Sequence, residues 1–155
     1  RPSASCNTVE RIAYSDIIVV GPGSLYTSII ANLIIPDISE AIINSRAKKV
    51  FICNIMSEEG ETDRLDCYGH LEKITDHVKN LKIDYMLINN KIIESDILER
   101  YDREHKHPVY VDDSQRAKIR ELGVQIIEDN LLRVSETGQI MHDSEKVARI
   151  LLDIL

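Results

Sequence analysis

The chain has 155 residues, 43% of them hydrophobic and 29% charged, which suits one globular domain with a substantial core. Its formal net charge of −7 argues against a general nucleic-acid or anionic-membrane surface, so any phosphate recognition must be local. No apolar run approaches the roughly 18 residues of a membrane span, and no signal peptide is visible. Three cysteines without a C-x-x-C spacing are typical of a reduced, cytoplasmic protein.

The first strand pattern follows an incomplete opening. The chain begins without methionine and shows only the tail of a helix pattern before residue 16, which indicates the later part of a longer protein that starts in mid-domain. Ile17–Val20 is an unbroken β-branched run that ends at a glycine, as is typical of a strand buried on both faces of a parallel sheet. A helix pattern follows, with Ser24 as its expected N-cap.

Helix and strand patterns then alternate to the end of the chain. Pro36 breaks the first helical stretch, and Asp37 or Ser39 is expected to cap the next helix, which runs to residue 45. Further strands are predicted at 50–53, 85–88 and 124–127, and further helices at about 67–79, 95–104, 114–122 and 144–155. The apolar runs 131–134 and 139–141 flank a glycine-containing turn and predict a small C-terminal β-hairpin. This order predicts a three-layer α/β fold with a mainly parallel sheet and helices on both faces.

The segment between the first strand and its helix is the main candidate for a ligand site. Gly21 and Gly23 let the backbone turn sharply and approach a ligand closely. Free N–H groups and the positive end of the helix dipole favour an anion at the helix start. The hydroxyls of Ser24, Thr27 and Ser28 can complete a cradle for a phosphate there. A tight turn with an N-cap and no ligand is the alternative.

Two familiar phosphate loops do not match this segment. A Walker A loop requires Gly-Lys-Ser/Thr, and no lysine lies between Asp16 and Arg46. The dinucleotide fingerprint G-x-G-x-x-G has Tyr26 in place of its third glycine, and the acid expected about 20 residues further on is Glu40, in a helix pattern. The segment is therefore a phosphate loop of another kind or a structural turn, and Tyr26 is more often a packing residue than a base-stacking one.

An acidic loop follows the second strand. The candidate ligand-binding residues here are Asn54, Glu61, Thr62, Asp63 and, in the next helix, His70. Glu61, Thr62, Asp63 and His70 can hold Mg²⁺ through carboxylates and phosphate oxygens, with the two acids as the main candidates, or act as acid–base groups. The alternative is a solvated loop in which Thr62, Asp63 or Asp66 caps the next helix. Asn54 can hydrogen-bond the edge of a base or ribose, or it can hydrogen-bond backbone groups of the loop itself. The histidine lies in the first turns of its helix, where the dipole disfavours a charged ring, so a hydrogen-bonding role suits it better than a cationic one.

Several stretches together resemble one known family. They are GPGSLYTSII, the proline break IIPDISEAI, VFICNIMSEEGETD with the His70 helix, and the closing IMHDSEKVARILL. These stretches resemble the YvcK-type gluconeogenesis factors, a branch of the superfamily that includes 2-phospho-L-lactate transferase (CofD). The family is longer, so the resemblance implies that residues 1–155 are the C-terminal part of a single CofD-like nucleotide-binding domain, without its N-terminal half. GPGSLYT, where the transferase branch has GPSNP-like residues, places the chain on the YvcK side.

The resemblance implies a Rossmann-like fold that binds a nucleotide, with a UDP-sugar such as UDP-N-acetylglucosamine as the expected ligand and no cofactor required. The role it implies is regulatory, supporting cell-wall synthesis and cell shape during gluconeogenic growth. A cell-wall precursor enzyme and a second copy of the protein stay open as partners. The implied nucleotide-binding residues are Gly21, Pro22, Gly23, Ser24, Tyr26, Thr27, Ser28, Asn54, Glu61, Thr62, Asp63 and His70. The family usually has Thr-Gln-Pro where Ser57-Glu58-Glu59 stands, so this chain carries extra acids beside the expected phosphate.

Two function classes stay open. The first is a nucleotide-sugar-binding regulator that needs no metal. The second is a phospholactate-type transferase acting on a nucleotide diphosphate-linked donor, with Mg²⁺ held by Glu61 and Asp63. The sequence offers no obvious nucleophile, and the extra acids supply charge without a coordination pattern, so the regulator is favoured. A third possibility is that this fragment, without its N-terminal half, binds nothing tightly.

Overall fold

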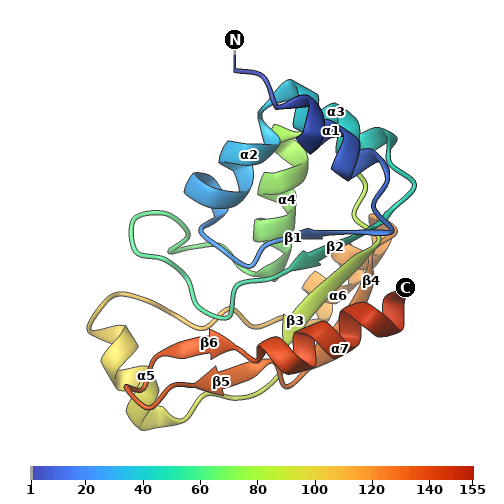
Figure 1. Ribbon diagram of the computed structural model, residues 1–155. Coiled ribbons are helices and arrows are strands. Elements are labelled where there is room, and N and C mark those ends of the chain that lie inside the picture. Colours follow the sequence, from blue (N-terminus) through green and yellow to red (C-terminus); the bar gives the residue numbers. More distant parts are fainter. Residues whose placement is uncertain (1) are drawn as a thin grey trace.

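Four strands form a parallel sheet in the order in which they occur along the chain (Figure 1). The computed structural model describes residues 2–155. The strands are β1 (Ile17–Val20), β2 (Lys48–Ile52), β3 (Tyr85–Asn89) and β4 (Gln125–Asp129). Each neighbouring pair is parallel, which confirms the predicted mainly parallel sheet, and the strand bounds agree with the predicted ones to within two residues.

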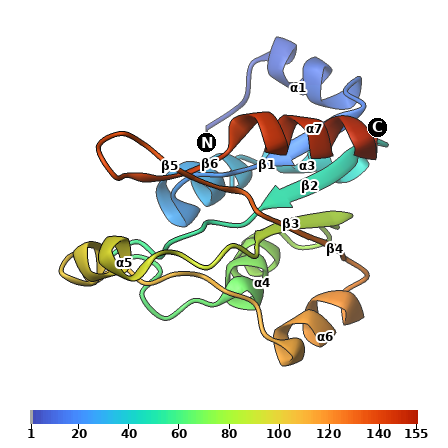
Figure 2. The same cartoon turned by 90° about the horizontal axis from the view of Figure 1, so that it is seen from below.

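Helices cover both faces of this sheet, as predicted (Figure 2). On one face lie α1 (Cys6–Ala13), η1 (Leu25–Ile30), α2 (Ala31–Leu33), α3 (Pro36–Asn44), α4 (Cys67–His77) and α6 (Asp113–Glu121). Among the described residues, the helix on the other face is α7 (Ser144–Ile154). Alternate side chains of each strand point to opposite faces, so Phe51 packs into the larger core while Val50 packs under α7. Burial on both faces explains why these strands are continuous apolar runs.

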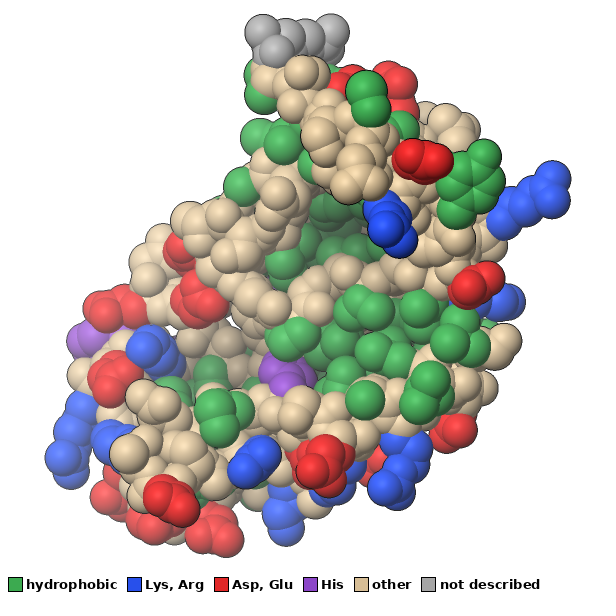
Figure 3. All heavy atoms as spheres, in the orientation of Figure 1, with side chains coloured by type: hydrophobic (Ala, Val, Ile, Leu, Met, Phe, Trp, Pro, Cys, Tyr) green, Lys and Arg blue, Asp and Glu red, His purple; other side chains and the backbone are tan. Residues whose placement is uncertain are grey.

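The face that carries α7 is not fully covered near β1 by residues 2–155. Val19 on β1 is 40% exposed, and Leu152 on α7 is also exposed. Figure 3 shows apolar side chains gathered over this region, between α1 and α7. In the part of the chain that is described, no single helix is long and apolar enough to cross a membrane. Leu25–Leu33 and Pro36–Asn44 meet that test only as a pair bent by 75°.

One helix start differs from the sequence prediction, and another agrees with it but has an unusual first turn. Neither Asp37 nor Ser39 caps α3: the helix begins at Pro36, and Ile35 occupies the N-cap position without a side-chain hydrogen bond. Proline suits this position because it has no N–H to leave unsatisfied and its φ is already helical. The helix after the glycine turn has Ser24 as its N-cap, as predicted. It starts as a π-helix, because Ile29 N, five residues on, donates to the Ser24 carbonyl at 3.0 Å in addition to the α-type bond from Ser28 N at 3.1 Å.

The predicted hairpin is confirmed as β5 (Leu132–Val134) and β6 (Ile140–His142), which pair antiparallel. It forms a unit with α5 (Ser95–Asp102), and side chains from both pack on Ile55 and Met56, just beyond β2. The Tyr101 hydroxyl accepts a hydrogen bond from Ile140 N at 2.8 Å, and the Arg100 guanidinium donates to carbonyls of the hairpin turn. This unit stands beside the carboxyl ends of the strands, where ligands bind in parallel sheets (Figure 1).

Candidate functional site

The turn after β1 requires glycine at its first position. Gly21 has φ +84°, a backbone conformation that residues with a Cβ rarely adopt. A Cβ there would lie 3.0 Å from the Ile52 carbonyl oxygen and 3.2 Å from Ile29 Cδ1. The turn therefore packs directly against the end of β2, with Pro22 following through a cis peptide bond.

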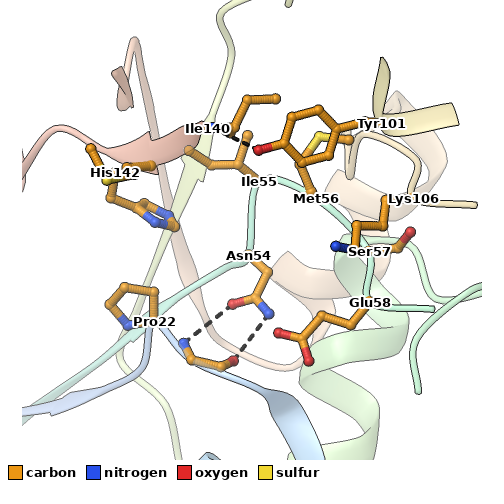
Figure 4. Close-up of a pocket in the computed structure, with 12 residues that line it drawn as sticks. Pro22, Asn54, Ile55, Met56, Ser57, Glu58, Tyr101, Lys106, Ile140 and His142 are labelled. Atoms are coloured by element: carbon orange, nitrogen blue, oxygen red, sulfur yellow. Dashed lines mark hydrogen bonds between the residues drawn. The ribbon is translucent and has the colours of Figure 1, made fainter. Parts of the chain in front are cut away.

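Asn54, the first polar residue after β2, braces this turn. Its Nδ2 donates to the Gly23 carbonyl at 3.0 Å, and its Oδ1 accepts from Gly23 N at 3.5 Å (Figure 4). Of the two roles that the sequence left open, the structure shows the one that satisfies loop backbone. The Asn54 side chain thus holds Gly23 next to the carboxyl end of β2 and fixes the conformation of the glycine turn.

The predicted hydroxyls gather at the start of the helix that follows. Ser24 is the N-cap: its Oγ accepts from Thr27 N at 3.2 Å and from Thr27 Oγ1 at 2.6 Å. Ser28 lies next to them, with its Cβ 3.4 Å from the position of a Cβ on Gly23, and both Thr27 and Ser28 are exposed. Ser24 Oγ donates its proton to Glu61 Oε2 at 2.7 Å. A carboxylate of the chain therefore faces the hydroxyls where a phosphate is expected.

The acidic loop is held mainly by its own contacts. Thr62 is completely buried and its Oγ1 accepts from Glu58 N at 2.8 Å. The exposed Asp63 carboxylate accepts from Gly60 N at 2.9 and 3.1 Å, and Asp66 caps α4 by accepting from Gly69 N. Glu61 and Asp63 thus have different partners. Within residues 2–155, no three His, Cys, Asp or Glu side chains gather in a way that could hold a metal ion.

Two carboxylates meet beside the Ser24 hydroxyl. The pKa of Glu58 is raised, first because burial disfavours its charged form and second because the neighbouring Glu61 carboxylate favours its protonated form. A ligand anion that binds at the helix start therefore has to separate or displace these groups.

His70 and Tyr26 make no hydrogen bond to the residues of this cluster. His70 is completely buried, its Nδ1 hydrogen-bonds the Asp66 carbonyl at 2.8 Å, and its Nε2 has no partner among the described residues. Burial lowers the pKa of His70, which agrees with the expected neutral ring. Tyr26 packs on the larger core. Its ring lies edge-on to the ring of His77, with 6.2 Å between the two ring centroids. Its contacts are those of a packing residue.

A pocket of about 380 Å³ opens between the glycine turn, the segment after β2 and the hairpin unit (Figure 4). Of the predicted residues, Pro22, Gly23 and Asn54 line it. The facing wall is formed by Tyr101, Lys106, Ile140, Met141 and His142, with Ile55, Met56, Ser57 and Glu58 between the two walls. The size lies in the range of small-molecule sites, and the lining combines apolar side chains with a few polar groups, as such sites do.

Three comparisons with known proteins agree on the family. The family model for 2-phospho-L-lactate transferase CofD matches residues 1–132. The chain belongs to the CofD family. It is 37% identical over 148 residues to the gluconeogenesis factor of Bacillus subtilis, covering 96% of this chain and 45% of that protein. It is 39% identical over 145 residues to the gluconeogenesis factor of Halalkalibacterium halodurans, covering 94% and 44%. The predicted resemblance is thus confirmed.

A solved structure has the same fold as this chain. A crystal structure of a Bacillus halodurans protein, described as a member of the upf0052 family, matches with a TM-score of 0.90 and 37% identity. The match covers 97% of this chain and 47% of that one. The chain therefore spans less than half the length of these relatives.

Sequence reasoning missed this facing wall of the pocket. Its hairpin residues Ile140, Met141 and His142 lie beyond the residues that the CofD family model matches, whereas Tyr101 and Lys106 lie within them. His142 is half-buried, and its Nε2 lies 3.1 Å from the Cys53 carbonyl oxygen. Lys106 brings a positive charge to the pocket. It pairs with Glu104 at 2.8 Å, and that hydrogen bond raises the pKa of Lys106. Lys106 belongs to no recognisable motif. His142 lies in the family-like stretch IMHDSEKVARILL, directly after a predicted strand, but nothing in the sequence marked it as a pocket residue.

Proposed function

We propose that this CofD-family chain is the ligand-binding C-terminal part of a cytoplasmic regulatory protein, a gluconeogenesis factor that binds a UDP-sugar such as UDP-N-acetylglucosamine. Its role would be to support cell-wall synthesis and cell shape during gluconeogenic growth. The observation that carries the binding proposal is the glycine turn, whose helix-start hydroxyls lie beside a pocket at the carboxyl ends of the strands. The gluconeogenesis factors among its relatives support the regulatory role.

The contact between Ser24 and Glu61 supports a phosphate at the helix start. The Ser24 hydroxyl already donates to an anionic oxygen at 2.7 Å, which is the bond that a phosphate oxygen would accept. Ser28 is exposed beside it and offers a further donor, and the exposed Thr27 hydroxyl offers another once it releases its hydrogen bond to Ser24 Oγ. A bound diphosphate would therefore replace the Glu61 carboxylate, and the nucleoside or sugar would extend into the pocket next to Gly23.

The description of the family model supports a second candidate, a phospholactate-type transferase. That reaction would bring Mg²⁺ to the diphosphate through Glu61 and Asp63. The contacts of these two acids favour the regulator, because Glu61 accepts from Ser24 whereas Asp63 accepts from Gly60 N within its own loop.

Ligand-dependent stability of the full-length protein tests the proposal. A ligand present at 100 times its Kd stabilises the folded state by about 2.7 kcal/mol, which raises the melting temperature measurably. We expect such a rise with UDP-N-acetylglucosamine and a smaller one, or none, with GDP, NAD or NADP. A rise with GDP alone would favour the transferase, and no rise with any of these nucleotides would contradict nucleotide binding.

A further inference from the structure

We propose that His142 recognises the base of the bound nucleotide by accepting a hydrogen bond from a ring N–H, so that the pocket selects uracil and guanine over cytosine and adenine. The proposal rests on the nucleotide binding proposed above and names a residue and a base class for it. Figure 4 shows the His142 ring extending from β6 toward Pro22 and Asn54, on the opposite wall of the pocket.

The Cys53 carbonyl fixes which nitrogen of His142 carries the proton. Nε2 lies 3.1 Å from that carbonyl oxygen, which can only accept, so Nε2 is the donor. In the neutral ring the lone pair then belongs to Nδ1. Burial lowers the pKa of His142, which keeps the ring neutral near pH 7. The histidine therefore offers the pocket an acceptor.

Nδ1 is accessible for this role. No group within residues 2–155 donates a hydrogen bond to Nδ1. Nδ1 is also not one of the unpartnered side-chain atoms that are shut off from solvent. His142 lines the pocket, so an entering ligand can reach the lone pair. Nε2 meanwhile anchors the ring to the end of β2, which holds the acceptor in a fixed direction.

The surroundings of this acceptor suit a flat ring. Pro22, Ile55, Met56 and Ile140 give the pocket apolar surfaces on several sides. A sugar would need a polar partner for each of its hydroxyls, whereas a base is apolar on its faces and polar only at its edge. The Tyr101 hydroxyl accepts from Ile140 N and keeps its own proton to donate, which suits a base carbonyl beside the ring N–H.

The middle ring atom of the Watson–Crick edge, N3 in a pyrimidine and N1 in a purine, decides which bases bind. Uracil and guanine carry an N–H there and can donate to Nδ1. Cytosine and adenine carry a lone pair at that place, which would face the Nδ1 lone pair with no proton between them. Leaving such a pair of acceptors unsatisfied should weaken binding at least about tenfold.

Calorimetry on the full-length protein with UDP, CDP and 3-methyl-UDP tests this selection. In 3-methyl-UDP a methyl group takes the place of the ring N–H hydrogen, and CDP has a lone pair there, so both nucleotides should bind at least about tenfold more weakly than UDP. In His142→Phe, which keeps an aromatic ring but has no acceptor, the three nucleotides should bind within about twofold of one another. The matched control is His77→Phe. His77 is exposed and lies outside the pocket, and its ring, like that of His142, hydrogen-bonds a backbone carbonyl. The His77→Phe variant should keep the preference for UDP.

The outcomes separate this proposal from the function on which it rests. If UDP and 3-methyl-UDP bind the unmodified protein equally well, nucleotide binding stands and the role of His142 is refuted. If His142→Phe keeps the full preference, another group reads the base and the proposal also fails. If none of the three nucleotides binds, both the proposed function and this inference are wrong.

Discussion

Replacing Gly21 with alanine should destabilise the protein more than the same change at two other glycines that share its backbone conformation. Gly21, Gly60 and Gly123 have φ values of +84°, +76° and +81°. A Cβ would meet nothing within 4 Å at Gly60 or Gly123. At Gly21 it would lie 3.0 Å from the Ile52 carbonyl oxygen, a backbone atom at the end of a sheet strand that cannot easily move. The three variants therefore differ mainly in this contact.

The expected magnitudes follow from these two effects. Alanine in the left-handed conformation costs about 1–2 kcal/mol, and this cost should appear in Gly60→Ala and Gly123→Ala alike. Forcing a methyl group into packed surroundings adds about 1–3 kcal/mol, so the total for Gly21→Ala should be about 2–5 kcal/mol. The free energy of unfolding of the three full-length variants, measured in urea beside the unmodified protein, gives these differences directly. Equal losses in all three would refute the tight packing of the glycine turn against β2.

Three further predictions concern the helix start and one ion pair. Ser24→Ala combined with Thr27→Ala should weaken binding of UDP-N-acetylglucosamine by about 1.5–3 kcal/mol for each hydroxyl that contacts the phosphate; unchanged affinity in calorimetry would exclude the cradle. Glu61→Gln should bind the same ligand about fivefold more tightly, because displacing a neutral amide costs about 1 kcal/mol less than displacing a carboxylate; weaker binding would mean that the carboxylate helps the ligand. The Arg116 guanidinium donates to both oxygens of Glu128 and lowers the pKa of that carboxyl. Its stabilising effect should therefore be present above the unfolded pKa of about 4.3 and disappear as the pH falls through the folded value. Urea unfolding of Glu128→Gln should show a loss near pH 7 that shrinks in acid, and a loss independent of pH would contradict this.

The sequence was sufficient for the sheet because the relevant signals are local. Ile17–Val20 and the later apolar runs are short, β-branched and separated by helix patterns, and each became a strand. The start of α3 was misplaced because Asp37 and Ser39 are good caps, whereas Pro36 already satisfies the helix start through its fixed φ and missing N–H.

The site was only partly predictable, for a different reason. The glycine turn and its hydroxyls lie within a few residues of one another, so the pattern is visible in the sequence. The pocket wall depends on contacts over long separations: His142 Nε2 meets the Cys53 carbonyl 89 positions away, and the Tyr101 hydroxyl meets Ile140 N 39 positions away. No spacing rule links such residues, and only the packing of the hairpin unit against the segment after β2 brings them together.

The most direct test of the proposed function is a titration of UDP-N-acetylglucosamine into the full-length protein with and without EDTA, repeated with Asp63→Asn. The Asp63 carboxylate accepts hydrogen bonds only from Gly60 N among the described residues, so a metal-free binder should not depend on its charge. We predict that the affinity in calorimetry survives both EDTA and Asp63→Asn. Binding that is abolished by EDTA and by Asp63→Asn alike would contradict the regulator and support a metal-assisted transferase.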